Sequence, residues 1–186
     1  MDTRDQLLDS AERLARSRGY DAFSYADLSA EVGIRKASIH HHFPTKADLA
    51  LALVDRYREG VALKLETAAK TAKTGAQRVA GFIATYRQAM NGGHSLCLCV
   101  AFSAGRESLS EPVLASLNQF NEDTTAWLRE AYTLADEDGS IAGLGEIAAE
   151  AAATLALVEG AQLIARAASD VSPFDQATHS LESRLT

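Results

Sequence analysis

A short basic segment stands out in this acidic chain. Residues 35–46 include Arg35, Lys36 and Lys46 together with three consecutive histidines, and they include no acidic residue. The whole chain of 186 residues has a formal net charge of −7, which argues against non-specific coating of nucleic acid. A local group of cations on an acidic protein is typical of an edge that binds the phosphates of DNA. The segment is therefore the first candidate for a functional site.

The residues around this segment predict a helix-turn-helix between positions 24 and 49. Ser24 is a favourable N-cap residue with Asp27 three positions later, and Gly33 can adopt the left-handed backbone conformation that a sharp turn requires. Three apolar residues would hold the second and third helices against the first: Ile34, Ile39 and Phe43. A helix, a glycine-containing turn and a second helix are the plan of a DNA-reading unit.

The third helix, residues 36–42, would present polar side chains to DNA. Those expected to face outward are Lys36, Ser38, His40 and His41. Short side chains at the start of a recognition helix can reach base edges while the backbone stays close to the DNA. Lys46 would begin the next helix, beside free backbone N–H groups, and clamp a phosphate there. Adjacent histidines point about 100° apart on a helix, so we do not expect residues 40–42 to bind a metal ion.

The rest of the chain predicts only helices. Its hydrophobic content of 47% suits a globular protein, and no segment shows the alternation of a strand. The expected helices span residues 3–17, a segment between Ser24 and Gly33, 36–42, a long segment after Thr45, 76–91, 96–107, 112–135, 145–168 and 173–184, with a loop at 136–145. We expect a DNA-binding domain at residues 1–50 and a second helical domain at residues 51–186, to which the family resemblance given by residues 33–49 assigns effector binding and dimerisation.

The run GIRKASIHHHFPTKADL, residues 33–49, resembles the end of the DNA-binding domain of the TetR (tetracycline-repressor) family. The order and spacing of Gly33, Phe43, Lys46 and Leu49 match the family pattern, and the resemblance covers residues 3–52. It implies that three residues lie in the major groove: Lys36, Ala37 and Ser38. It also implies that four residues contact backbone phosphates: Tyr25, His40, His41 and Lys46.

Two of these positions depart from the family pattern. His40 stands where many members have tyrosine, so its phosphate contact would be shorter and could depend on pH. Tyr25 stands where a small hydroxyl residue is common, which weakens the assignment of Tyr25 to a phosphate.

Residues 145–168 form a predicted helix that is apolar on nearly every side. Its apolar residues include Ile147, Ala151, Leu155, Val158, Leu163 and Ile164, and its polar residues form only a narrow stripe. Such a helix packs its own core with one face and a further surface with the other, and Gly160 allows close approach. The family resemblance implies that residues 145–168 and 173–184 form half of a four-helix interface between two copies related by a two-fold axis.

Aromatic residues recur along the predicted helices of the second domain. Most would serve the core, and the family resemblance implies that some line a ligand cavity: Phe82, Tyr86, Phe102, Phe120 and Trp127. His94 and Arg106 are the polar groups that would orient an anionic ligand. A ligand bound among these helices would tilt the fourth helix, which carries the DNA-binding head, so ligand and DNA would bind with negative coupling.

These features predict a ligand-responsive transcriptional regulator, a repressor that binds a palindromic operator as a homodimer. The N-terminal residues lack the apolar region of a signal peptide, and the longest uncharged stretch, residues 88–105, is interrupted by polar residues, so we expect a cytoplasmic protein. No catalytic motif or cofactor loop occurs, which predicts a non-enzyme without a cofactor. Two alternatives remain open: a helical carrier or enzyme whose DNA-binding head is not functional, and an activator of the same fold.

The two cysteines, Cys97 and Cys99, are one residue apart. This spacing gives neither a disulfide framework nor a CxxC metal or redox pair. Because it places the two thiols on opposite sides of a helix, small buried cysteines are the simplest interpretation, and a thiol sensor is the alternative.

Overall fold

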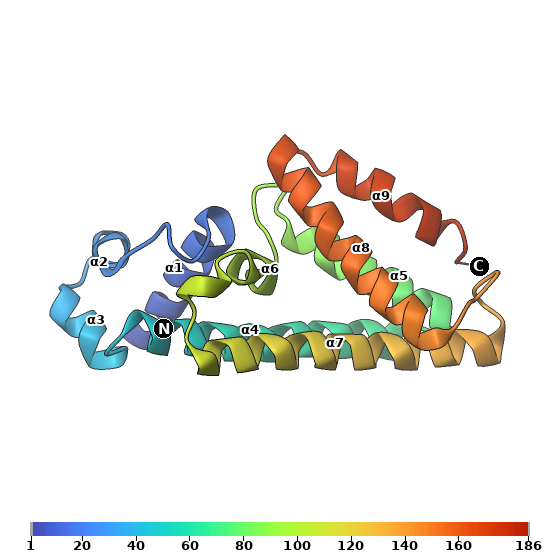
Figure 1. Cartoon of the computed structure of the whole chain (residues 1–186), viewed down its shortest axis with the longest axis horizontal. Coiled ribbons are helices and arrows are strands. Elements are labelled where there is room, and N and C mark those ends of the chain that lie inside the picture. Colours follow the sequence, from blue (N-terminus) through green and yellow to red (C-terminus); the bar gives the residue numbers. More distant parts are fainter. Residues whose placement is uncertain (1, 186) are drawn as a thin grey trace. The chain divides into compact units, whose positions relative to one another are not determined.

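The computed structural model describes residues 2–185, and every regular element in that range is a helix (Figure 1). The elements are α1 (Thr3–Arg18), α2 (Tyr25–Val32), α3 (Lys36–His42), α4 (Lys46–Thr71), α5 (Gly75–Ala89), α6 (Leu98–Ser103), the 3-10 helix η1 (Arg106–Ser108), α7 (Glu111–Asp138), α8 (Ile147–Ala168) and α9 (Ser172–Glu182). An isolated antiparallel β-bridge joins Ile141 to Leu185. The predicted all-α class is confirmed.

The largest difference from the predicted helices lies around α6. The sequence predicts one helix over residues 96–107, whereas α6 ends at Ser103 and η1 follows as a separate turn. Gly105 lies between them with φ −107° and ψ 30°, and glycine opposes helix continuation at such a point. α7 then begins at Glu111, so that Pro112 lies in its first turn, where proline is favoured.

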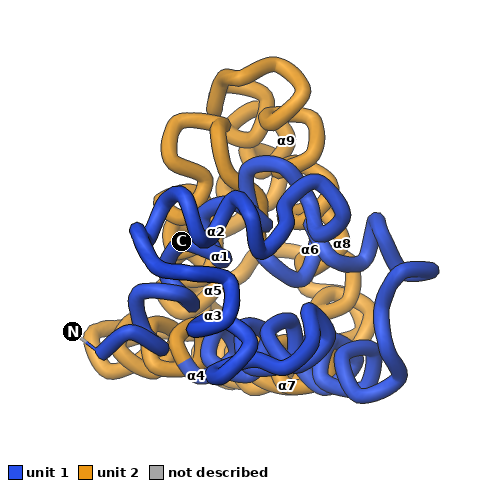
Figure 2. Tube along the Cα trace, turned by 90° about the vertical axis from the view of Figure 1, so that its left-hand side faces the viewer, with its two compact units in different colours: residues 1–59, 98–120 blue, residues 60–97, 121–186 orange. Residues whose placement is uncertain are grey.

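Contacts divide the chain into two compact units, which Figure 2 shows in different colours. The first consists of residues 1–59 and 98–120, and the second of residues 60–97 and 121–186. The predicted domains, residues 1–50 and 51–186, are instead consecutive segments; their outermost residues, 1 and 186, lie outside the described range. The difference arises because residues 98–120, which include α6, η1 and the start of α7, belong to the first unit although they follow residues 60–97 of the second.

The first unit is built around α1. Its completely or almost completely buried side chains come from α1 to α4: Leu7, Leu8, Ala11, Leu28, Ile39, Phe43, Leu49 and Leu53. α6 completes this core, since Phe102 is buried with its ring centroid 5.1 Å from that of Tyr20. The Ser108 hydroxyl donates to Asp21 Oδ2 at 3.0 Å. The loop between α1 and α2 is therefore held by a segment that is distant in the sequence.

The second unit packs α5, α8 and α9 with parts of α4 and α7. Phe82, Tyr132 and Phe174 are among its largest fully buried side chains. The Tyr132 hydroxyl lies 2.6 Å from Thr154 Oγ1, so the polar end of this buried ring has a partner, as burial requires. Glu146 caps α8 by accepting the N–H groups of Ala148 and Ala149, which stabilises the helix start.

The start of α5 lies directly against the end of α7 in the second unit. The Gly75 N–H donates to Asp138 Oδ2 at 2.8 Å, and the Ala76 N–H donates to Ser140 Oγ at 2.9 Å. A Cβ atom on Gly75 would lie 2.2 Å from the Ala135 nitrogen and 2.5 Å from the Ala135 Cβ. Only glycine fits this contact without moving one of the two helices.

We therefore expect Gly75→Ala to lower the free energy of unfolding by about 2–3 kcal/mol, the usual cost of overpacking, measured by denaturant unfolding. Gly60→Ala is the matched control, because Gly60 is an exposed residue within α4 with nothing within 4 Å of its added Cβ. That variant is expected to be neutral or stabilising, since alanine favours the helix. Equal stability of the two variants would contradict the close α5–α7 contact.

Candidate nucleic-acid interface

The turn that presents α3 is formed by local contacts. The Ser24 N–H donates to Asp27 Oδ2 at 2.7 Å, and Ser24 Oγ accepts from the Ala26 N–H at 3.2 Å, which together begin α2. α2 ends at Val32, and Gly33 caps it with a left-handed backbone, φ 75° and ψ 27°. α3 then begins at Lys36. The predicted cap and the predicted turn glycine are both confirmed.

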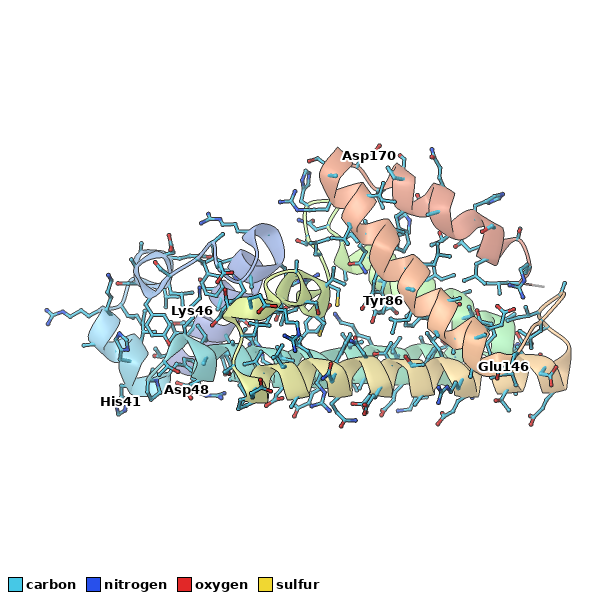
Figure 3. All side chains as sticks on the ribbon, in the orientation of Figure 1. His41, Lys46, Asp48, Tyr86, Glu146 and Asp170 are labelled. Atoms are coloured by element: carbon cyan, nitrogen blue, oxygen red, sulfur yellow. The ribbon has the colours of Figure 1, made fainter. Side chains whose placement is uncertain are left out.

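α3 is attached to the first unit on one side only. Ile39, which was expected to pack inward, is completely buried. The residues predicted to contact DNA from this helix are all exposed: Lys36, Ala37, Ser38, His40 and His41. Figure 3 shows the His41 side chain pointing away from the ribbon of α3. A short helix with an apolar anchor and an exposed face free of acidic residues is suited to lie in a major groove.

His40 lies at the end of α3 with a defined ring orientation. Its Nδ1 is 3.0 Å from the Pro44 carbonyl oxygen, and its ring centroid is 4.9 Å from that of Tyr25. In the neutral ring, an Nδ1–H that donates to this carbonyl leaves Nε2 as the second polar atom. Protonation at Nε2 would make it a donor to a phosphate oxygen.

The Lys46 ammonium binds backbone carbonyl oxygens of its own chain, whereas the sequence predicts that it clamps a phosphate of DNA. The ammonium donates to the carbonyl oxygens of Tyr20 and Phe23 at 2.6 and 2.7 Å, and it lies 4.4 and 4.5 Å from the centroids of the same two rings. Burial lowers the pKa of Lys46, while Asp21 and Asp27 oppose that shift. The ammonium thus closes the loop between α1 and α2 instead of facing solvent.

The Tyr25 hydroxyl also binds backbone carbonyl oxygens, whereas the sequence predicts that it contacts a phosphate. The hydroxyl lies 2.9 Å from the Phe43 carbonyl oxygen and 2.6 Å from that of Thr45, and it donates to this pair. Burial, followed by the nearby Asp48, raises the pKa of Tyr25 to about 12, so the hydroxyl keeps its proton. Tyr25 therefore ties α2 to the turn between α3 and α4, and its proton is not available to a phosphate in this arrangement.

That turn also caps α4. The Thr45 N–H donates to Asp48 Oδ2 at 2.9 Å, and the Asp48 N–H donates to Thr45 Oγ1 at 3.1 Å. The sequence predicts this pair as the start of the fourth helix, and the prediction is confirmed. Lys46, Tyr25 and the Thr45–Asp48 cap together fix how α3 is held.

Sequence reasoning did not find Arg4. Its guanidinium carbon lies 5.3 Å from the centroid of the Phe43 ring, at the end of α3, and the side chain is exposed. An exposed cation on the first turn of α1, beside the recognition helix, is a further candidate for phosphate contact. No motif marks it; only the packing of α1 against Phe43 brings it there.

The residues predicted to line a ligand cavity belong to two different units. Phe82, Tyr86 and Trp127 come together in the second unit, with ring centroids of Phe82 4.6 Å from Tyr86 and 6.2 Å from Trp127. Phe102 and Phe120 belong instead to the first unit, where they contact Tyr20 and Tyr57. Three of the five aromatic predictions therefore form one row.

The two polar residues predicted to orient an anionic ligand lie at the surface. His94 is exposed in the loop before α6. Arg106 is exposed over 66% of its side chain and lies 3.9 Å from Glu107. Neither residue lies in an enclosed site, and the role predicted for the two residues stays a prediction. A groove of about 540 Å³ is present between residues 63–71 of α4 and 85–89 of α5, and Tyr86 and the other predicted ligand residues do not line it.

Cys97 and Cys99 are both buried, with 1% and 2% of their surfaces exposed, and no disulfide occurs among the described residues. Thiols that sense oxidants are usually accessible and lie in electropositive surroundings. The burial of both thiols favours the interpretation as core residues.

Comparisons with known proteins agree with the site. Residues 7–53 match the family described as "Bacterial regulatory proteins, tetR family". A TetR-family transcriptional regulator from Agrobacterium tumefaciens has a similar structure, with a TM-score of 0.92 and 32% identity, covering 98% of this chain and 97% of that one. The HTH-type transcriptional repressor NemR of Escherichia coli is 27% identical over 181 residues, 95% of this chain and 90% of NemR. The crystal structure of NemR in its reduced form has a TM-score of 0.84 at 26% identity and covers all of this chain and 98% of that one.

Proposed function

Because this chain belongs to the TetR family of bacterial regulatory proteins, we propose that it is a repressor that binds a palindromic operator as a homodimer and is released by a small-molecule effector. Transcriptional regulation is the function of the relatives, which are named as regulators and repressors. The family is one of regulators and not of enzymes. We place the protein in the cytoplasm, where its DNA target is found.

The exposed face of α3 is the observation that carries the proposal. Ile39 anchors the helix while Lys36, Ala37 and Ser38 remain exposed. We assign these three residues to the major groove, where short side chains permit close approach to base edges. We assign His40 and His41, with Arg4, to the flanking phosphates. Lys46 and Tyr25 act indirectly, by holding the helix that makes these contacts.

The exposed side of α8 supports the homodimer. α8 has the length and composition of a helix that could cross a membrane, and only 33% of its most apolar part is buried. Its other side packs in the second unit through Ala151, Val158 and Ala165. The exposed side is a continuous apolar stripe made of Ala149, Ala152, Ala153, Ala156, Leu163, Ile164 and Ala167. A second copy of the same helix would cover this stripe about a two-fold axis.

Dimerisation gives the two recognition helices a fixed separation. Two helices read successive major grooves on one side of DNA when they lie about 34–36 Å apart. An effector that binds the second unit and changes this separation would weaken DNA binding, and the operator would weaken effector binding by the same factor.

The test begins with selection of genomic fragments by the purified protein. We expect one palindromic site to be enriched, and we expect Ser38→Val to bind it about 10–100-fold more weakly, as loss of a base contact does. The affinity for unrelated DNA should not change. Fluorescence anisotropy at several salt concentrations measures both affinities.

Ser180→Val is the matched control, since Ser180 is also exposed but lies on α9 in the second unit. It should bind the selected operator as tightly as the wild type. If Ser38→Val kept the wild-type preference for the operator, α3 would not be the reading helix. If no fragment were enriched at all, the proposed regulator would be wrong.

A further inference from the structure

Two polar side chains of α8, the buried Gln162 and the part-buried Glu159, have buried atoms without partners. Gln162 is 1% exposed, and its Oε1 accepts the Cys97 N–H at 2.8 Å. Its Nε2 is buried and has no hydrogen-bond partner among the described residues, and the same is true of Glu159 Oε1. Residues three apart on a helix lie on one face, with their Cβ atoms about 5–6 Å from each other. One small group can therefore reach both.

Such atoms are unusual in a folded protein. A buried donor or acceptor that has lost its water and gained no partner destabilises the fold. Other buried polar groups of this unit do have partners, as Tyr132 and Thr154 do in each other, although Arg78 Nε also lacks a hydrogen-bond partner among the described residues. Two such atoms three positions apart on one helix suggest that a molecule other than the chain supplies the partners.

The surroundings of Glu159 restrict the charge of that molecule. Burial, and after it the nearby Cys97, raises the pKa of the Glu159 carboxyl to about 8, so at pH 7 this carboxyl is mostly neutral. Both influences oppose negative charge. A second carboxylate brought beside Glu159 would meet the same opposition, whereas an N–H or O–H group would satisfy Glu159 Oε1. A ligand oxygen beside that group could accept the free N–H of Gln162.

We propose that Glu159 and Gln162 bind the polar end of the effector, and that this effector is an apolar molecule with an amide, hydroxyl or ammonium donor and no carboxylate. The aromatic row of Phe82, Tyr86 and Trp127 in the same unit is suited to the apolar body of such a molecule. The inference rests on the proposed regulatory function and deepens it. It also replaces the anionic ligand that His94 and Arg106 predicted from the sequence.

The first measurement needs no ligand. If the Glu159 carboxyl has no structural partner, Glu159→Leu removes an unsatisfied polar group and should raise Tm by about 3 °C. Gln162→Leu should instead lower Tm, because the Cys97 N–H loses its acceptor. Glu130→Leu, at an exposed position of α7, is the control and should leave Tm unchanged. A lower Tm for Glu159→Leu would show that the carboxyl has a structural role, and it would overturn the inference.

The second measurement uses probes that share one skeleton and differ in the polar group. The probes are phenylacetamide, phenylethanol, phenethylamine and phenylacetate, together with the four corresponding cyclohexyl compounds. Each probe is titrated into the protein while the fluorescence of Trp127, the only tryptophan of the chain, is recorded. We expect at least one donor-bearing probe to bind about ten-fold more tightly than the matching carboxylate. Glu159→Leu should lose that preference, and Glu130→Leu should keep it. Preference for the amide or alcohol over the amine would identify a neutral effector, and the reverse a cationic one.

Equal or tighter binding of the carboxylates, or no binding of any donor-bearing probe, would overturn the inference. Binding of the selected operator by the wild type is followed in the same samples. Failure to bind any operator would disprove the regulator, while the probe preference would still be measured, so the two failures can be told apart.

Discussion

Lys46→Met is expected to lower the free energy of unfolding by about 3 kcal/mol in the absence of DNA, from the loss of two charge-assisted hydrogen bonds and a cation–π contact. The ammonium donates to the carbonyl oxygens of Tyr20 and Phe23. Without it, both oxygens lose their partner in a part-buried loop, and methionine cannot replace a donor. Thermal unfolding should show a Tm lower by about 9 °C.

The prediction separates a structural role of Lys46 from a phosphate contact. Lys36→Met is the matched control, because Lys36 is exposed on α3 and the substitution removes the same charge. It should leave Tm unchanged, weaken binding to all DNA and reduce the slope of log affinity against log salt by about one for each phosphate that is no longer neutralised. If Lys46→Met instead kept its Tm and changed only the salt slope, the ammonium would serve the phosphate after all.

The local features of the head could be predicted from the sequence because their causes are local. The Ser24–Asp27 and Thr45–Asp48 caps each involve residues three positions apart. Gly33 adopts the left-handed conformation that its turn needs. The buried face of each helix follows from apolar periodicity, so the element order of the first four helices and the exposed face of α3 could both be predicted.

The roles of Lys46 and Tyr25 could not be predicted in the same way. Their partners are backbone carbonyl oxygens, 18 to 26 positions away in the chain. A carbonyl oxygen is present at every residue, so nothing in the sequence marks the ones that lack a partner. A lysine that closes a loop and a lysine that clamps a phosphate occupy the same place in a motif.

The residues of an effector site are harder to predict from the sequence for a related reason. His94 and Arg106 have the chemistry to bind an anion, but residue type does not determine which side of a loop faces water, and both are exposed. Glu159 could not be predicted as a site residue, because an acid in an apolar helix is usually solvated. The burial of its Oε1 depends on how the Cys97 segment packs beside α8, which helical periodicity does not specify.

The largest expected effect on assembly concerns the exposed stripe of α8. Leu163 and Ile164 are 48% and 59% exposed, so glutamate at both positions should not disturb the core of the second unit. In the proposed homodimer each substitution occurs twice, and burial of such a side chain contributes roughly 1–2 kcal/mol. We expect the dimer dissociation constant of the double variant to rise by about 1000-fold or more.

Sedimentation velocity over a concentration series measures this change, and circular dichroism should show unchanged helix content. Leu63→Glu is the control, because Leu63 is 63% exposed on α4 and lies outside the stripe; it should remain dimeric. The double variant should also lose most of its operator affinity, since a monomer places one recognition helix on one half-site. A double variant that stayed dimeric would exclude the α8 stripe as the interface, and the spacing of the two heads would then have to come from another surface.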